Sequence, residues 1–164
     1  MANINDVFAE KYDFSQFESF VEIVNTSDDF LENSLLKAHQ DMKSFIICAK
    51  ETEAGLKNKT SVYTKFLDAS NAIPKGYKLY ISKNMTDILD IDQFFGFLNN
   101  MAGSMETYSR LVLLEKNIEV KEIEEVMNIK NLNDIDYTLS ESGFFLTNAI
   151  KIADKTYILE ILKK

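Results

Sequence analysis

Apolar residues recur at helical spacing through two long stretches of the chain. Between Asp28 and Glu53, spacings of four and three place one set on a single stripe of an α-helix: Leu31, Leu35, Ala38, Met42, Phe45 and Ala49. A second stretch repeats these spacings: Phe94, Leu98, Met101, Met105, Tyr108 and Val112. The two heptad seams predict two long helices that pack together, within one chain or across a dimer.

Polar residues mark where these helices should begin and end. The run Thr26–Asp29 offers side-chain oxygens to the unpaired first-turn N–H groups, and Gly55 suits a left-handed C-cap. Asp90 or Asp92 is expected to cap the second helix. A glycine inside a helix is unfavourable, so Gly103 leaves open whether the second stretch is one helix or two.

Shorter patterns fill the rest of the first two thirds of the chain. Phe14 to Val24 follows helical spacing, which predicts a helix that ends near Asn25 and forms an αα-hairpin with the long one. Ser61–Ser70 is compatible with helix or strand, and helix is favoured. After a turn at Pro74–Gly76, the alternation in Tyr77–Ile81 predicts a short strand.

The last 60 or so residues show a more specific order of elements. Helical spacing predicts three helices followed by a β-hairpin, with Gly143 closing the third helix. The expected ranges are Ser104–Lys116, Val120–Met127 and Leu132–Ser142 for the helices, and Phe144–Ile152 and Thr156–Leu162 for the strands.

This order resembles the winged helix-turn-helix superfamily. Ile129 stands where such folds place an apolar residue in the turn, and Gly143 stands where the third helix leads into the wing. The resemblance implies that the third helix and the hairpin form the interaction surface. The candidate residues are Asn131, Asn133, Asp134, Asp136, Tyr137, Glu141, Lys151 and Lys155.

The charge of these positions departs from the pattern of a DNA-binding member. Asp134, Asp136 and Glu141 put negative charge where phosphates would lie, and the wing offers only Lys151 and Lys155. Neutralisation of phosphates supplies much of the affinity in such complexes. We therefore expect this surface to contact protein rather than DNA.

Composition bounds the architecture. The chain has 164 residues, of which 46% are hydrophobic, with only one proline and five glycines. These values favour long regular elements in one ordinary globular domain. The expected fold class is α+β and predominantly α-helical. Residues 1–103 would form a helical region with a short strand near 77–82, and 104–164 a winged-helix-like unit, or the two would be one continuous domain.

Charge and cysteine content limit the partners and the compartment. The net charge is −8, with a basic middle between two acidic ends. This balance disfavours direct nucleic-acid binding and anionic membranes, and is compatible with either plain solvated surface or a protein partner that has a basic surface. Cys48 is the only cysteine, and no apolar run approaches a membrane span. We expect a cytoplasmic protein.

The sequence offers no catalytic, metal-binding or cofactor-binding set. His39 is the only histidine, and neither a phosphate-binding glycine motif nor a nucleophile elbow occurs. Glu122, Glu124 and Glu125 are adjacent acids that suit a solvated helix face better than acid–base chemistry.

Together these features predict a small acidic, non-enzymatic regulator or inhibitor that binds a protein with a basic, nucleic-acid-binding surface. One alternative is a winged-helix transcription regulator that dimerises through its long helices. A second alternative is an assembly or scaffold subunit whose heptad seams face other chains.

Overall fold

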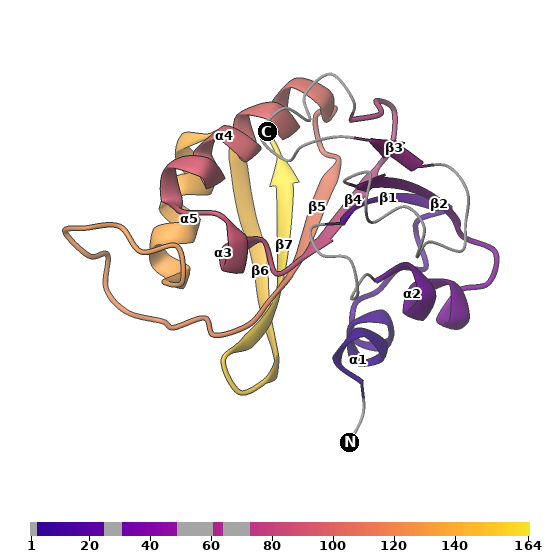
Figure 1. The fold of residues 1–164 in the computed structure, drawn as a ribbon, viewed down its shortest axis with the longest axis horizontal. Helices are drawn as coiled ribbons and strands as arrows, with labels where there is room; N and C mark the ends of the chain where they lie inside the picture. Colours follow the sequence, from indigo (N-terminus) through magenta and orange to yellow (C-terminus); the bar gives the residue numbers. More distant parts are fainter. Residues whose placement is uncertain (1–2, 25–30, 49–60, 64–72) are drawn as a thin grey trace.

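A mixed β-sheet of seven strands runs through the molecule (Figure 1). The computed structural model describes residues 3–24, 31–48, 61–63 and 73–164. Within these ranges the strand order is β3-β2-β1-β4-β5-β7-β6. The strands are β1 Ser19–Val24, β2 Lys43–Cys48, β3 Ser61–Tyr63, β4 Leu79–Lys83, β5 Arg110–Glu115, β6 Phe144–Ala153 and β7 Thr156–Lys163.

The sheet has a parallel part and an antiparallel edge. Strands β3, β2, β1, β4 and β5 pair in parallel along the order of the sheet. Strand β7 pairs antiparallel with β5, and β6 completes the hairpin at the edge. Parallel neighbours need crossover connections, which put helices over both faces of a sheet.

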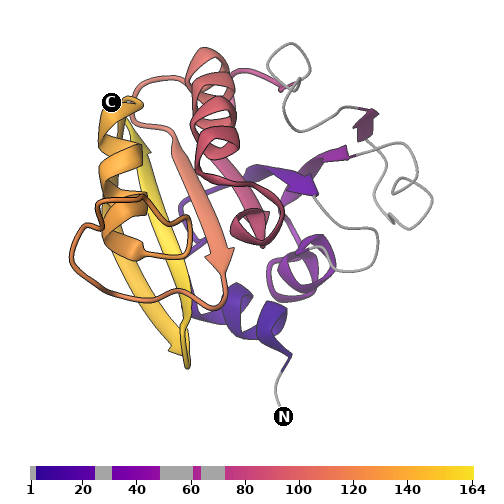
Figure 2. The ribbon, with the colours of Figure 1, turned by 60° about the vertical axis from the view of Figure 1, so that its left-hand side comes forward.

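Helices cover the two faces in two groups (Figures 1 and 2). One group packs on a core that contains Phe8, Leu35 and Val112, and the other on a core that contains Phe97, Leu111 and Ile135. No helix in the described part of the chain is long and apolar enough to cross a bilayer. The helices are α1 Ile4–Lys11, α2 Glu32–Ala38, α3 Met85–Ile88, α4 Ile91–Ser104 and α5 Leu132–Glu141.

The fold class expected from the sequence is wrong. The structure is a helix-covered mixed sheet and lacks two long helices among its described residues. Within the described residues 31–48 of the expected rod from Asp28 to Glu53, only α2 is helical, and the chain turns at His39–Met42 into strand β2. The Phe14–Val24 segment forms β1 at its end instead of a helix. Both strands lie in the middle of the sheet, where apolar side chains are needed on both faces.

The second heptad seam is also divided between two elements. Its first half forms α4, and Asp90, one of the two caps expected for this helix, is the observed cap. The Asp90 side chain accepts a hydrogen bond from Gln93 N–H (2.8 Å), and Gln93 Oε1 accepts one from Asp90 N–H (3.0 Å). After Ser104 the chain leaves the helix and forms β5. Residues 120–127, expected to be a helix, form neither helix nor strand.

The described part of the chain therefore lacks the first two helices of the winged-helix order, but it has the third helix and the hairpin. Helix α5 and the β6–β7 hairpin match the expected ranges closely, and Gly143 has the left-handed φ of 88° expected after the helix. Strand β4 confirms the strand near 77–82. The favoured helix at Ser61–Ser70 is wrong for Ser61–Tyr63, which form β3, and residues 64–70 lie outside the described ranges. The division at residues 103 and 104 stays a prediction, although strands from both sides lie in one sheet.

Candidate functional site

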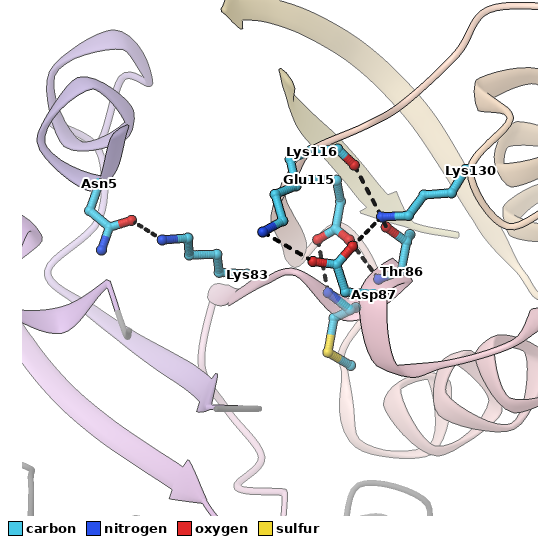
Figure 3. Close-up of polar contacts among 8 residues, drawn as sticks. Asn5, Lys83, Thr86, Asp87, Glu115, Lys116 and Lys130 are labelled. Atoms are coloured by element: carbon cyan, nitrogen blue, oxygen red, sulfur yellow. Dashed lines mark hydrogen bonds and ion pairs between the residues drawn. The ribbon is translucent and has the colours of Figure 1, made fainter. Parts of the chain in front are cut away.

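The strand order reverses between β1 and β4. From β1 the chain builds outward to β2 and β3, and then returns to β4 on the opposite side of β1. In open α/β sheets, ligands bind in the crevice beyond the carboxyl ends of the strands at such a reversal. The candidate site is therefore the edge where β1, β4 and β5 end, which carries Lys83 and Glu115 (Figure 3).

A buried carboxyl group on β1 caps the helix that follows. Glu22 accepts hydrogen bonds from Leu31 N–H (2.7 Å) and Glu32 N–H (2.8 Å), at the start of α2. The Glu22 side chain is 1% exposed, and this burial raises the pKa of its carboxyl group to about 8. The two N–H donors act in the opposite direction, because they stabilise the charged form.

A second buried carboxyl group makes the same contact on the other face of the sheet. Glu115, at the end of β5, accepts from Met85 N–H (3.1 Å) and Thr86 N–H (2.7 Å) at the start of α3 (Figure 3). Burial raises the pKa of Glu115 to about 7, and hydrogen bonds from Thr86 oppose the rise. Both helix starts at this edge therefore already have an internal oxygen partner.

Ion pairs hold the loop after β4. Asn84 turns the chain with a left-handed φ of 59°, and Asp87 follows on α3. Asp87 forms ion pairs with Lys116 (3.5 Å) and with Lys130, which also donates to Thr86 Oγ1 (2.7 Å) (Figure 3). Since each Asp87 oxygen faces an ammonium group, its carboxylate is placed to fix the loop rather than to accept a substrate proton.

A small cavity opens beside these contacts. Its volume is about 300 Å³, and its lining includes Ile4, Lys83, Asn84, Leu114 and Lys116. The buried ammonium group of Lys83 donates to Asn5 Oδ1 on α1 (2.6 Å) (Figure 3). The cavity combines apolar walls with two ammonium groups, a composition that suits a small organic molecule with an anionic end.

Among the described residues, no group of three or more His, Cys, Asp and Glu side chains could hold a metal ion. Phosphate groups commonly bind at free N–H groups of a helix N-terminus. At this edge, Glu22 and Glu115 each occupy two successive N–H groups at the starts of α2 and α3.

Three residues of the expected interaction surface instead support the chain around α5. Asn131 is buried and caps α5, accepting from Asn133 N–H (3.1 Å). The Asn133 side chain donates to the Lys121 carbonyl oxygen, and buried Asp134 accepts from Asn128 N–H (2.9 Å). Their side chains thus have internal partners in this structure.

The remaining candidates are exposed but spread over two elements. Asp136, Tyr137 and Glu141 lie on α5. Lys151 is on β6, and Lys155 is in the hairpin turn, where its ammonium group lies 3.3 Å from Glu119. The proposed interaction surface formed by these residues stays a prediction.

Sequence reasoning missed Glu22, Lys83 and Glu115. A signal was available: Glu22 interrupts the apolar run from Phe20 to Val24, and Glu115 ends the apolar run of β5. A charged residue is almost never fully buried unless it has a partner. A single carboxyl group within or directly after an apolar strand therefore points to a helix start or a ligand nearby.

Comparison with known proteins gives a clear result for structures and none for sequences. No protein-family model matches the chain, and no curated protein matches it. The solved structures that match include mitomycin 7-O-methyltransferase MmcR (20% identity, TM-score 0.78), the neocarzinostatin-biosynthesis O-methyltransferase NcsB1 with S-adenosylmethionine and a naphthoic acid (17%, 0.76), and the dimethyltransferase RosA from Streptomyces davawensis (16%, 0.78). The fold is that of these methyltransferases.

The methyltransferase fold covers nearly all of this chain but about half of each relative. The matches include 98%, 96% and 98% of this chain, and 53%, 52% and 53% of MmcR, NcsB1 and RosA. This chain therefore spans about half the length of the structures that it matches.

These matches correct the functional expectations. The winged helix-turn-helix resemblance is wrong, because the last 60 residues belong to a methyltransferase-like sheet. The non-enzymatic, protein-binding regulator or inhibitor was inferred from the acidic ends, the acidic third helix and the missing catalytic set. It is not supported, because the fold is instead shared with enzymes. The transcription regulator loses the winged-helix-like unit, and the scaffold alternative loses the two long helices.

Proposed function

We propose that this chain is the cofactor-binding half of an S-adenosylmethionine-dependent methyltransferase that modifies a small molecule. The observation that carries the proposal is the match of nearly the whole chain to methyltransferases at TM-scores of 0.76 to 0.78. The strand reversal at β1 and β4 supplies the crevice in which such a fold binds its ligand.

The buried carboxyl groups at this edge are compatible with S-adenosylmethionine. This cofactor has an adenosine, a sulfonium group and an amino acid end, but no phosphate. It therefore does not need the free helix N-terminus that a nucleotide phosphate uses. Glu22 and Glu115 occupy those N–H groups and so favour an adenosyl ligand without phosphates over a nucleotide.

The residues around the 300 Å³ cavity would hold the polar end of the cofactor. Lys83 and Lys116 carry positive charge suited to its carboxylate, and the amide of Asn5 can orient Lys83. Leu114 and Ile4 offer apolar surface and exclude water. When bound, the cofactor supplies a methyl group activated by the positive sulfur.

The activity and the acceptor of the complete enzyme belong to the same proposal. The matched methyltransferases are about twice as long as the part of them that this chain covers. We infer that this chain, which covers about half of each matched methyltransferase, binds and orients the cofactor. The left-handed turn at Asn84 and the ion pairs of Asp87 hold the β4 edge in place for it.

Isothermal titration with S-adenosylhomocysteine and with ADP tests the proposal, because the two ligands share adenosine and differ in the phosphates. We expect the chain to bind S-adenosylhomocysteine and to bind ADP much more weakly. Lys83→Met should weaken the first affinity by roughly tenfold or more, whereas Lys164→Met, at the exposed C-terminal residue, should leave it unchanged. Preference for ADP, or binding of neither ligand by the folded chain, contradicts the proposal.

A further inference from the structure

The connection between β5 and α5 presents apolar side chains to solvent. Residues 116–131 contain Val120, Ile123 and Val126, whose exposed fractions are 59%, 63% and 81%. In Figure 1 this connection is the orange loop that projects beside α5. Single exposed apolar residues are ordinary, but several on one short segment often mark a binding surface.

Polar contacts anchor both ends of this connection. Glu119 N–H donates to the Lys130 carbonyl oxygen and Leu132 N–H to the Glu119 carbonyl oxygen, both at 2.8 Å. Asn131 Nδ2 donates to the Glu122 carbonyl oxygen (3.2 Å). At the far end Lys130 is tied to Thr86 and Asp87 on α3. A surface that is ordered before binding loses less conformational entropy when a ligand arrives.

A groove lies between this connection and the start of α4. Its volume is about 400 Å³, within the range of small-molecule sites. Asp90 and Ile91 line one side, and the connection supplies Glu124, Val126, Met127 and Ile129. We call it the α4 groove.

The charge of the α4 groove selects its occupant. Within the described part of the chain, Asp90 and Glu124 form no ion pair. Of the nearby cations, Lys130 pairs with Asp87, and Lys121 pairs with Glu119 while it attracts Glu124 only from a greater distance. Two carboxylates above apolar side chains attract a cation whose body is apolar, and they repel an apolar anion of the same shape.

We propose that the α4 groove binds a small apolar organic cation. A bulky organic cation enters the groove more readily than a compact ammonium ion, because weak hydration lowers the cost of its burial. The apolar body would contact Val126 and Ile129, and the positive charge would face Asp90 and Glu124. Lys130 links this connection to α3, which directly follows β4. The further step, that the cation is the methyl acceptor, rests on the proposed function.

Two ions of matched shape and opposite charge test the groove: tetraphenylphosphonium and tetraphenylborate. Methyl-labelled chain is titrated with each ion, without any adenosyl ligand, and the spectra are followed by NMR. We expect saturable shifts of the Ile91, Val126 and Ile129 methyl groups, and an affinity for the cation that exceeds that for the anion by roughly tenfold. Because no cofactor is present, this outcome is independent of adenosyl binding.

Paired variants separate the groove from unspecific adsorption. Val126→Ser and Glu124→Gln should each weaken binding of the phosphonium ion several-fold, whereas Tyr108→Ser and Glu141→Gln change exposed residues outside the groove and should not. Equal affinity for the two ions, or shifts confined to other residues, overturns the proposal. Binding of an amphipathic leucine–lysine peptide without binding of the phosphonium ion also overturns it, in favour of a protein partner.

Discussion

Glu22 and Glu115 make the same contact on opposite faces of one sheet. Each is a buried glutamate on a strand, and each accepts hydrogen bonds from two successive backbone N–H groups at the start of a helix. One helix follows β1 and the other follows β4, the two strands between which the strand order reverses. The pair therefore fixes both walls of the candidate site.

The pair predicts a pH dependence of stability. Burial raises the folded-state pKa of Glu22 to about 8 and of Glu115 to about 7, from an ordinary value of 4.5. Between the ordinary pKa and the raised pKa of each group, the folded state therefore binds more protons than the unfolded state does. The contribution of each carboxyl group is fully present below its unfolded pKa and is lost as the pH rises through its folded pKa. Urea unfolding from pH 5 to pH 9 measures this loss.

Glu22→Gln isolates the effect. The variant lacks the titrating group, so the difference in free energy of unfolding between wild type and variant should shrink as the pH rises toward about 8. Glu141→Gln, at an exposed position of α5, serves as the control. A wild-type-to-variant difference that is constant across this range would count against a raised Glu22 pKa.

Because of the capping box of α4, we expect substitution of Asp90 to lower stability more than substitution of the nearby Asp92 does. Asp90→Ala removes the side-chain acceptor of Gln93 N–H and should lower the free energy of unfolding by about 1 kcal/mol. Asp92 lies in the first turn but makes no cap, so Asp92→Ala should have a smaller effect. Thermal denaturation of both variants checks the order, and equal losses would show that the cap contributes nothing of its own.

We expect the contacts of Lys130 to stabilise the connection between β5 and α5. Lys130→Met removes the contacts to Thr86, Asp87 and the Lys116 carbonyl oxygen. Because these are hydrogen bonds from a charged donor, the loss should be about 1.5–3 kcal/mol. Amide hydrogen exchange of residues 118–130 should become faster, while α4 stays protected. Lys121→Met, which removes an exposed ion pair with Glu119, is the control and should change little.

Two glycines predict opposite effects of the same substitution. Gly143 has a φ of 88°, so Gly143→Ala should lower the free energy of unfolding by about 1–2 kcal/mol. Gly96 lies inside α4, and a Cβ there would meet no atom within 4 Å. Gly96→Ala should therefore raise stability by about 0.8–1 kcal/mol. Urea midpoints that move in the same direction for both variants would contradict this assignment.

Sequence patterns predicted the elements that carry strong local signals. Gly143 provides a left-handed turn between α5 and the hairpin. Helix α4 begins at its cap Asp90. Each of these signals acts within a few residues, so it can be recognised without knowledge of the tertiary structure.

The parallel strands were missed for a physical reason. Strands β1, β2 and β5 are short apolar runs, and a strand buried on both faces does not alternate as an exposed strand does. The residues of β2 and β5 happened to continue the helical spacing of α2 and α4. The candidate site was missed with them, because Lys83 and Glu115 come together only when β4 and β5 pair.

The proposed function requires the edge formed by β1, β4 and β5 to bind an adenosyl ligand without phosphates. The most direct measurement is the change in backbone and side-chain amide NMR signals of the ¹⁵N-labelled chain during titration with S-adenosylhomocysteine. We expect saturable shifts at Asn5, Lys83 and Asn84, which ADP does not reproduce. Unchanged spectra at millimolar ligand, or shifts confined to residues away from this edge, would contradict it.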